Sequence, residues 1–176
     1  MTDSLVIEEW PSAHPRWAEL LQVVQAEQQT TWVAATFPWH RSTHMLVATQ
    51  ETAIIGFLRF VTQLIGEDQE LEPVRLAGEA LIEAKVLPFT VLPAARRKGV
   101  GRALQERALA AAAQLGCYQV RSHSSGAQSA NHQLKLAMGF GIHPIVRDDD
   151  RRGAYFIMPL RMTRWPPRDP SSEMPL

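Results

Sequence analysis

The chain has 176 residues, of which 45% are hydrophobic, a size that suits one domain with a single core. Lys plus Arg and Asp plus Glu number 18 each, so no net charge would attract nucleic acid or an anionic membrane. The single cysteine excludes an internal disulfide, and no apolar run approaches a membrane span. We therefore expect a cytoplasmic protein.

The first segment predicts one short strand and two helices. Alternating residues suggest a strand near residues 5–8, and apolar residues at helical spacing predict a helix over 15–28. A second short helix is expected over 31–37, where Pro38 ends it. His40 and His44 stand four residues apart, but Pro38 argues against a helix there and no third ligand is near, so we predict no metal site.

The middle of the chain predicts strands. Residues 45–49 and 53–64 form a β-hairpin in this interpretation, and the acidic segment 65–77 is expected to be an exposed loop or a lip over a binding site. Residues 79–92 resemble one long strand. Alternation places Glu83 and Val91 on the same side of it, unless a bulge changes the phase.

A basic, glycine-spaced loop follows this strand and precedes a helix expected over 103–115. Helix amino termini carry unsatisfied N–H groups and partial positive charge, and glycine lets an anion approach the backbone. Arginine and lysine add formal charge. The pattern predicts a pyrophosphate site formed by Arg96, Arg97, Lys98, Gly99, Val100, Gly101 and Arg102.

Two motifs carry a family resemblance. Arg96-x-x-Gly99-x-Gly101 follows a strand, and Ala127-Gln128 is followed eleven residues later by Gly139-Phe140. Together they resemble the GCN5-related N-acetyltransferases (GNAT). The resemblance implies an α/β (α+β) fold, in which a central mixed, mostly antiparallel twisted sheet is flanked by helices. It also implies a parallel strand pair that splays apart.

The resemblance further implies the cofactor and its contacts. Acetyl-CoA would serve as co-substrate, and backbone groups around Phe89 and Val91 would bond its pantetheine arm. Gln128 and Asn131 are the candidates for polar contacts to that arm. The acceptor would be a primary amine of a small molecule or peptide, attacking directly in a ternary complex. In the family the first helices border the acceptor pocket. Aromatic residues there are candidates for its wall, although core packing is favoured for each: Trp32, Phe37 and Trp39.

The catalytic residues depart from the family pattern. Lys85 stands roughly where some members carry a carboxylate, so Glu83 is our candidate general base, and a surface pair between these two residues is the alternative. Lys135 stands where a tyrosine often protonates the CoA thiolate. It is our candidate acid or electrostatic stabiliser, although a solvated helix-face lysine is the commoner case. Cys117 at a strand start is expected to be inert.

The remaining elements complete one domain over residues 1–162. A strand over 117–122, a helix over 127–138 and a final hairpin of 140–147 and 154–160 are expected. Residues 163–176 form a Pro-rich tail.

Two other functions compete with an enzyme. A catalytically silent domain that senses acyl-CoA would bind the cofactor without releasing CoA. A nucleic-acid patch over 96–107 would bind with a steep salt dependence, but the neutral charge disfavours it. The family often dimerises, so a homodimer is a candidate state. The sequence does not identify the acceptor.

Overall fold

A seven-stranded mixed sheet forms the centre of the protein. The computed structural model describes residues 4–125, 129–147 and 150–161. The strands of the sheet run in the order β1-β2-β3-β6-β7-β9-β8, and β4 pairs with β5 in a separate small hairpin. The strands are β1 Leu5–Glu9, β2 Ser42–Gln50, β3 Ala53–Leu64, β4 Arg75–Leu76, β5 Glu79–Ala80, β6 Ile82–Val91, β7 Gln119–Ser125, β8 Gly141–Arg147 and β9 Asp150–Pro159.

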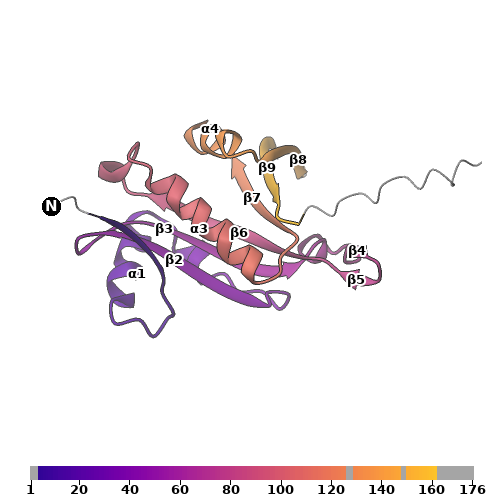
Figure 1. Cartoon of the computed structure of the whole chain (residues 1–176), viewed down its shortest axis with the longest axis horizontal. Coiled ribbons are helices and arrows are strands. Elements are labelled where there is room, and N and C mark those ends of the chain that lie inside the picture. Colours follow the sequence, from indigo (N-terminus) through magenta and orange to yellow (C-terminus); the bar gives the residue numbers. More distant parts are fainter. Residues whose placement is uncertain (1–3, 126–128, 148–149, 162–176) are drawn as a thin grey trace, which may run out of the picture.

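All neighbouring strands of the sheet are antiparallel except β6 and β7, which are parallel. This is the predicted fold class. Helices cover both faces: α1 lies on one side, and α3 and α4 lie on the other (Figure 1). The helices are α1 Trp17–Ala26, α2 Thr30–Ala34, α3 Val100–Gln114 and α4 Ser129–Ala137.

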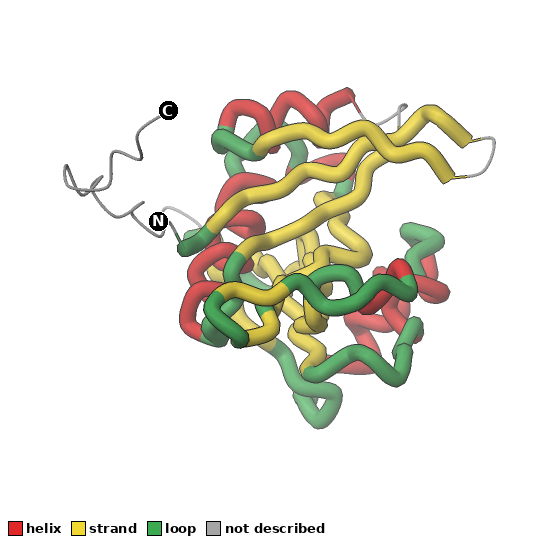
Figure 2. Tube along the Cα trace, turned by 90° about the vertical axis from the view of Figure 1, so that its right-hand side faces the viewer, coloured by secondary structure: helices red, strands yellow, loops and turns green. Residues whose placement is uncertain are grey.

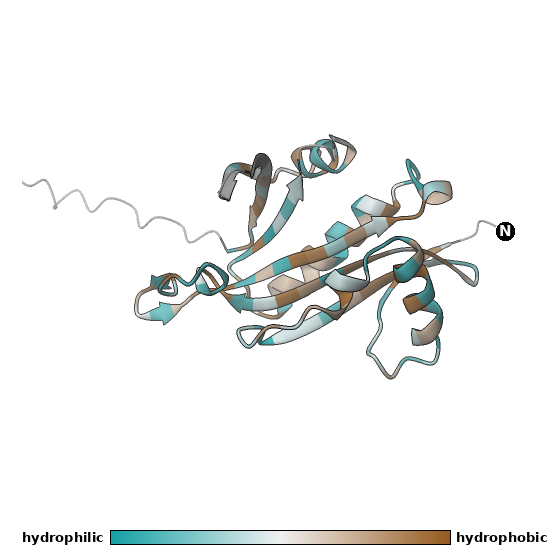
Figure 3. Ribbon diagram, turned by 180° about the vertical axis from the view of Figure 1, so that it is seen from behind, coloured by the Kyte–Doolittle hydropathy of each residue, from teal (hydrophilic) through white to brown (hydrophobic). Residues whose placement is uncertain are grey.

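Strand alternation gives the sheet two apolar faces. On one face Leu46, Leu58 and Phe60 pack with the buried side of α3. On the other, Met45 and Phe57 pack with α1. Figure 3 shows hydrophobic residues running along the central strands. The two cores explain why the central part of β2, from Met45 to Ala48, and most of β3 are apolar on both faces rather than alternating with polar residues.

A β-bulge interrupts β6 and changes the direction of its side chains. Leu58 pairs with Phe89 but Phe60 pairs with Val86, so one residue of β3 faces two of β6. Pro88, which has no N–H to give to the ladder, lies in this irregular step. Before the bulge Val86 points towards the α3 core, and after it Phe89 does. The bulge anticipated as an exception to the alternation is therefore present.

Most predicted elements are confirmed, with shifted ends. The helix expected over 103–115 begins three residues earlier, and the strand expected over 79–92 divides into short β5 and long β6. The final hairpin of β8 and β9 is longer than expected, and Figure 2 shows the two strands extending side by side. Among the described residues no helix is both long and apolar enough to cross a membrane. Residues 163–176 lie outside the described residues.

Candidate active site

The loop at residues 96–102 ends in an open helix terminus. Gly99 is the residue before α3 and has φ +83°, a left-handed conformation that glycine adopts without strain. Arg97 also has a positive φ, of 64°. Among the described residues, the amides of residues 97–102 donate to no hydrogen-bond acceptor. These amides and the positive end of the helix can bind an anion.

Gly101 allows α3 to approach the neighbouring elements closely. A Cβ atom added there would lie 3.3 Å from Leu134 Cδ2, 3.3 Å from Phe89 Cζ and 3.5 Å from Val91 Cγ2. The glycine therefore lies between β6 and α4, with little room for a side chain. Its role is packing, whereas that of Gly99 is conformational.

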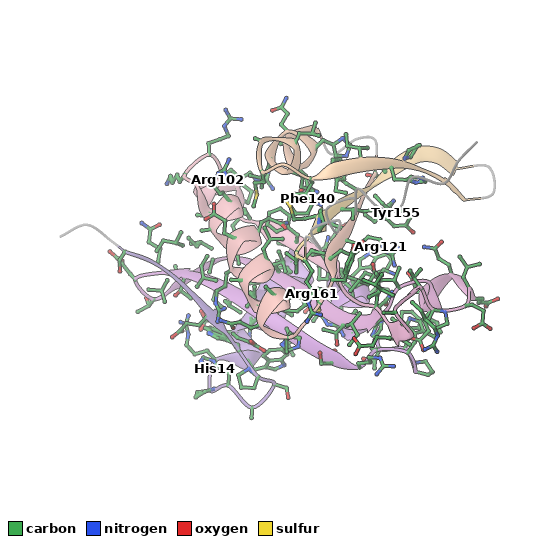
Figure 4. All side chains as sticks on the ribbon, turned by 45° about the vertical axis from the view of Figure 1, so that its right-hand side comes forward. His14, Arg102, Arg121, Phe140, Tyr155 and Arg161 are labelled. Carbon is green, nitrogen blue, oxygen red and sulfur yellow. The ribbon has the colours of Figure 1, made fainter. Side chains whose placement is uncertain are left out.

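The basic side chains of the loop differ in what they contact. Arg96 Nε donates to the carbonyl of Val91 at 3.0 Å, so this side chain fastens the loop to the end of β6. Arg102 lies near Glu106 at 3.7 Å, and Figure 4 shows it at the amino-terminal end of α3. Arg97 and Lys98 are exposed. Arg97, Lys98 and Arg102 are thus able to reach a ligand that binds to these amides.

The parallel pair separates beside this loop. Pairing of β6 with β7 runs from Glu83–Gln119 to Val86–Ser122 and stops there, although both strands continue. Beyond Ser122, β7 pairs only with β9 in the described sheet. The divergence is visible in Figure 1. The expected splay is present, and it leaves the backbone of Phe89 and Val91 without a β7 partner.

Lys135 lies at the point of separation. Its Nζ donates to Ser122 Oγ at 2.5 Å and lies 5.2 Å from the centre of the Phe156 ring. The side chain is fully buried, and burial lowers its pKa from 10.5 to about 8. The solvated helix-face lysine considered from the sequence is therefore wrong. Among the described residues no carboxylate pairs with this ammonium.

Asn131 and His132 meet Ser124 on β7. Asn131 Nδ2 donates to Ser124 Oγ at 3.2 Å, and His132 Nε2 lies 3.0 Å from the same oxygen. Asn131 Oδ1 is buried without a partner in the described structure, so it has an unused acceptor near the splay. Gln128, the other predicted contact to the cofactor, lies outside the described residues.

Glu83 is buried on the opposite face of the sheet, that of α1. Its carboxylate accepts from Gln63 at 3.0 Å, from Gln119 at 2.9 Å and from Arg121 at 2.6 to 3.1 Å. The proposed alternative, a surface pair with Lys85, does not form. Glu83 also borders a cavity of about 510 Å³.

Asp68 extends this polar network from the loop after β3. It accepts from Lys85 at 2.5 Å and from Arg121 at 2.8 Å. Burial alone would raise the pKa of Asp68, but the hydrogen bonds from Lys85 and Arg121 outweigh it and lower that pKa. Burial alone would lower the pKa of Arg121, but its hydrogen bonds to Glu83 and Asp68 and their charges raise it. Figure 4 shows Arg121 beside Tyr155, whose ring centre lies 4.7 Å from the guanidinium carbon.

The segment 65–77 is thus only partly the exposed loop that we expected. Asp68 is held inside, while the apolar residues that follow it are exposed or border the cavity of Glu83: Leu71, Val74 and Leu76. In the sequence, Asp68 is one of several acidic residues of the segment 65–77, and nothing distinguishes it from the others. Its partner Arg121 is 53 residues away, and nothing local identifies the pair.

Two of the aromatic residues for which core packing was favoured are exposed instead. Trp32 is 53% exposed and Phe37 is 43% exposed, so the favoured core packing is wrong for both. Phe37 stacks on half-buried Trp39 with ring centres 4.9 Å apart. His40, next to them, has a pKa lowered by burial and then by the charges of Arg59 and Lys85. Among the described residues no group of three or more His, Cys, Asp or Glu could hold a metal ion.

Cys117 is fully buried in the core beneath α3. Burial raises the pKa of its thiol from 9.0 to about 11, and the charge of Glu83 adds to the effect. A thiol in this state carries almost no thiolate at neutral pH, as expected for an inert cysteine.

Comparisons with known proteins agree with this geometry. A search of curated proteins gave no match. Arabidopsis thaliana NAA60 in complex with acetyl-CoA superposes with a TM-score of 0.66 over 89% of this chain and 99% of its own, at 15% identity. The ribosomal-protein-S18-alanine N-acetyltransferase of Escherichia coli gives a TM-score of 0.61 over 91% and 96%, at 17% identity. The model of the Acetyltransferase (GNAT) family matches residues 6–140. The chain belongs to the GNAT family of acetyltransferases.

Proposed function

We propose that the protein is an acetyl-CoA-dependent N-acetyltransferase that moves the acetyl group to a primary amine of a small molecule or peptide. One observation carries the proposal: the unbonded amides of residues 97–102 open next to a parallel strand pair that separates after Val86 and Ser122. Helix-terminal amides bind phosphate, and the separation exposes backbone groups for an extended chain. The acetyl-CoA bound to the Arabidopsis neighbour supports this cofactor.

In this proposal the pyrophosphate of acetyl-CoA lies against residues 97–102. Arg97, Lys98 and Arg102 add charge, and Arg96 holds the loop to Val91. The pantetheine arm bonds the backbone near Phe89 and Val91, with Asn131 and Gln128 as polar contacts. The unused Oδ1 of Asn131 supports its assignment.

The transfer is a direct attack. The neutral amine nitrogen forms a bond to the thioester carbonyl carbon, the carbon–sulfur bond breaks, and the electron pair leaves with CoA as a thiolate. The amine gives up one proton, and the thiolate takes up one. At pH 7 an alkylammonium with a pKa of about 10.4 must first be deprotonated, at a cost of about 5 kcal/mol. The reaction therefore needs one group that accepts the proton of the amine and one that donates a proton to the thiolate.

Lys135 is the proposed donor to the thiolate. Its pKa of about 8 lies close to that of a free thiol, about 8.5, so proton transfer between the two is nearly balanced. Its position at the end of the β6–β7 pairing supports the assignment, because the extended arm between the strands would bring its sulfur to that end.

Glu83 is the proposed proton acceptor, acting through water from the opposite face. The carboxylate is buried among Gln63, Gln119 and Arg121, so an amine cannot reach it directly without displacing one of them. The cavity that Glu83 borders supports the route through water.

Release of CoA thiol tests the function. Acetyl-CoA should give heat in calorimetry, and some member of an amine panel should release CoA with it. Binding without release from any amine would favour the silent acyl-CoA sensor. No heat with acetyl-CoA would refute the cofactor site.

Glu83→Gln tests the base. If Glu83 takes the proton, the acid limb of the pH profile of kcat/KM disappears in the variant. If Glu83 only holds Arg121, turnover falls by the same factor at every pH. Unchanged turnover would remove the assignment altogether.

We also propose that the enzyme works in the cytoplasm, because its one cysteine is a free thiol. A homodimer remains a prediction from the family resemblance. Size-exclusion chromatography with light scattering would test it.

A further inference from the structure

A second cavity, of about 470 Å³, lies on the face of the sheet that carries α1 and α2. Its lining combines large apolar side chains with one cation: Trp10, Trp17, Met45 and Arg59. Trp10 and Met45 belong to the core cluster on this face, and Trp17 packs against it. The rest of the lining adds polar side chains, so the cavity combines apolar surface with groups that can orient a small molecule: Glu9, Ser12, Thr36 and Thr43.

Arg59 is a buried cation without an acidic partner. The residue is 2% exposed. Its guanidinium donates to the carbonyl of Trp32 at 2.7 Å and to Thr43 Oγ1 at 3.4 Å. No described carboxylate lies within ion-pair distance of it. Burial lowers its pKa, and no acidic group opposes this effect. An uncompensated buried charge is costly, so its presence needs a reason.

Arg121 provides an internal comparison on the same face of the sheet. It is nearly as buried as Arg59, but Glu83 and Asp68 both accept from its guanidinium. The protein therefore pairs one buried arginine with two carboxylates and leaves the other to neutral oxygens. The unpaired arginine is the one that borders the cavity of 470 Å³.

The cavity also holds one carboxylate in its lining, that of Glu9. This side chain lies near the outer edge of the sheet and is 42% exposed. Its Oε1 is 2.7 Å from Nδ1 of His44. Glu9 therefore interacts with His44 and with solvent, and it does not neutralise Arg59.

The position of Arg59 relates the cavity to the splay. Arg59 lies between Leu58 and Phe60, which pair with Phe89 and Val86, so it faces the bulge of β6. Since Leu58 and Phe60 point towards α3, alternation points Arg59 to the α1 face. The parallel pair separates immediately after Val86. A molecule bound at Arg59 would thus lie at the same position along the sheet as the separation of β6 and β7, on the face of the sheet opposite to Lys135.

We propose that Arg59 binds the carboxylate of the acetyl acceptor, and that this acceptor is an amino acid with an apolar or aromatic side chain. A guanidinium and a carboxylate form two parallel charge-assisted hydrogen bonds, which would supply the missing counter-charge. Trp10, Trp17 and Met45 supply apolar surface for the side chain. The inference rests on the proposed function, since it names the acceptor class for the same transfer.

Binding measurements test the inference separately from turnover. Tryptophan, tryptophanamide and tryptamine share one side chain, and only the first has a carboxylate. In calorimetry with CoA present, tryptophan should bind at least tenfold more tightly than the other two. Arg59→Met should weaken tryptophan roughly 10- to 100-fold, the range for hydrogen bonds to a charged group, and should change the amide and the amine little. Equal binding of all three compounds would overturn the inference.

Two further variants provide the control and a second test. Arg75→Met removes an exposed arginine that donates to the carbonyl of Gly78 at 3.0 Å, outside the cavity lining, and should not change tryptophan binding. Arg59→Lys keeps the charge without the paired geometry, so it should retain weak binding and serves if Arg59→Met does not fold. A loss of binding in Arg75→Met equal to that in Arg59→Met would contradict a specific role for Arg59.

Turnover then distinguishes the two proposals. If tryptamine releases CoA as efficiently as tryptophan, the acetyltransferase proposal stands and the carboxylate site is refuted. If tryptophan binds through Arg59 but no amine releases CoA, the carboxylate site stands and the enzyme proposal fails. If both stand, kcat/KM for tryptophan should exceed that for tryptamine at least tenfold, and Arg59→Met should abolish the difference.

Discussion

Replacing Lys135 by methionine should make the protein more stable at neutral pH. The buried ammonium has Ser122 as its hydrogen-bond acceptor and a pKa lowered by burial from 10.5 to about 8. That difference corresponds to about 3 kcal/mol at neutral pH, at 1.36 kcal/mol per pKa unit. Loss of the hydrogen bond with Ser122 returns about 1 kcal/mol. Methionine has a similar length, so we expect Lys135→Met to gain about 2 kcal/mol at pH 7.

The pH dependence gives a sharper test than stability alone. Because the folded-state pKa of Lys135 is below its unfolded value, the unfolded chain binds more protons between about 8 and 10.5, and stability rises with pH across this window. The wild-type protein should therefore gain about 1 kcal/mol relative to Lys135→Met between pH 7 and pH 9. Cys117 acts in the opposite direction, but mainly between 9 and about 11, and both proteins contain it.

Urea unfolding of both proteins at pH 7 and pH 9 measures these differences. If the variant is less stable at pH 7, or if the difference between the two proteins does not change with pH, then Lys135 is not a buried cation with a lowered pKa. The same variant should release CoA more slowly than the wild type. A gain in stability together with a loss of turnover would indicate that the cation is kept for function.

Three substitutions and one thiol measurement test separate parts of the structure. Gly101→Val should abolish the calorimetric heat of acetyl-CoA, because the added atoms would meet Leu134 and Phe89. Gly99→Ala meets nothing within 4 Å and should keep that heat while losing about 1 kcal/mol of stability to its positive φ. Asp68→Asn should destabilise the protein at pH 7 by about 3 kcal/mol in urea unfolding. The Asp68 carboxylate stabilises the wild type above its unfolded pKa of 3.8, and this stability is lost as pH falls through its lowered folded pKa. The variant should lack this pH-dependent stability. Cys117 should react with a thiol reagent at pH 8 only after denaturation, so CoA release can be followed without correction.

The sequence predicted the cofactor side of the site well, because the signals there are local. The turn at Gly99, the start of α3 and the strand before it lie within about twenty residues. Glycine conformation and helix ends depend on near neighbours. A bulge was considered as an exception to the alternation, and Pro88, which has no N–H for a regular ladder, lies at the bulge that the structure contains. The fold class was implied by the family resemblance that these motifs carry.

The opposite face could not be predicted in the same way, because its contacts join distant segments. Asp68 and Arg121 meet across 53 residues, and Lys135 is buried because β9 places Phe156 beside it. Helical periodicity alone would put that lysine in solvent. Arg59 did carry a usable signal: it is the one charged residue within the apolar strand of residues 53–64. A charge in a buried strand requires a partner, and we propose that a ligand carboxylate is that partner.

Two buried cations have no carboxylate partner in the described part of the chain, and in our proposal they let one sheet serve two substrates. Lys135 lies on the face of α3 and α4, and Arg59 lies on the face of α1, on either side of the level where β6 and β7 separate. In the proposed reaction a negative charge reaches each: the thiolate of departing CoA near Lys135, and the acceptor carboxylate at Arg59. Each cation is destabilising alone and compensated once its partner is present. Binding of each ligand should therefore stabilise the protein. If β6 and β7 were paired along their whole length, the sheet would separate the two charged sites, whereas the gap between the strands connects them.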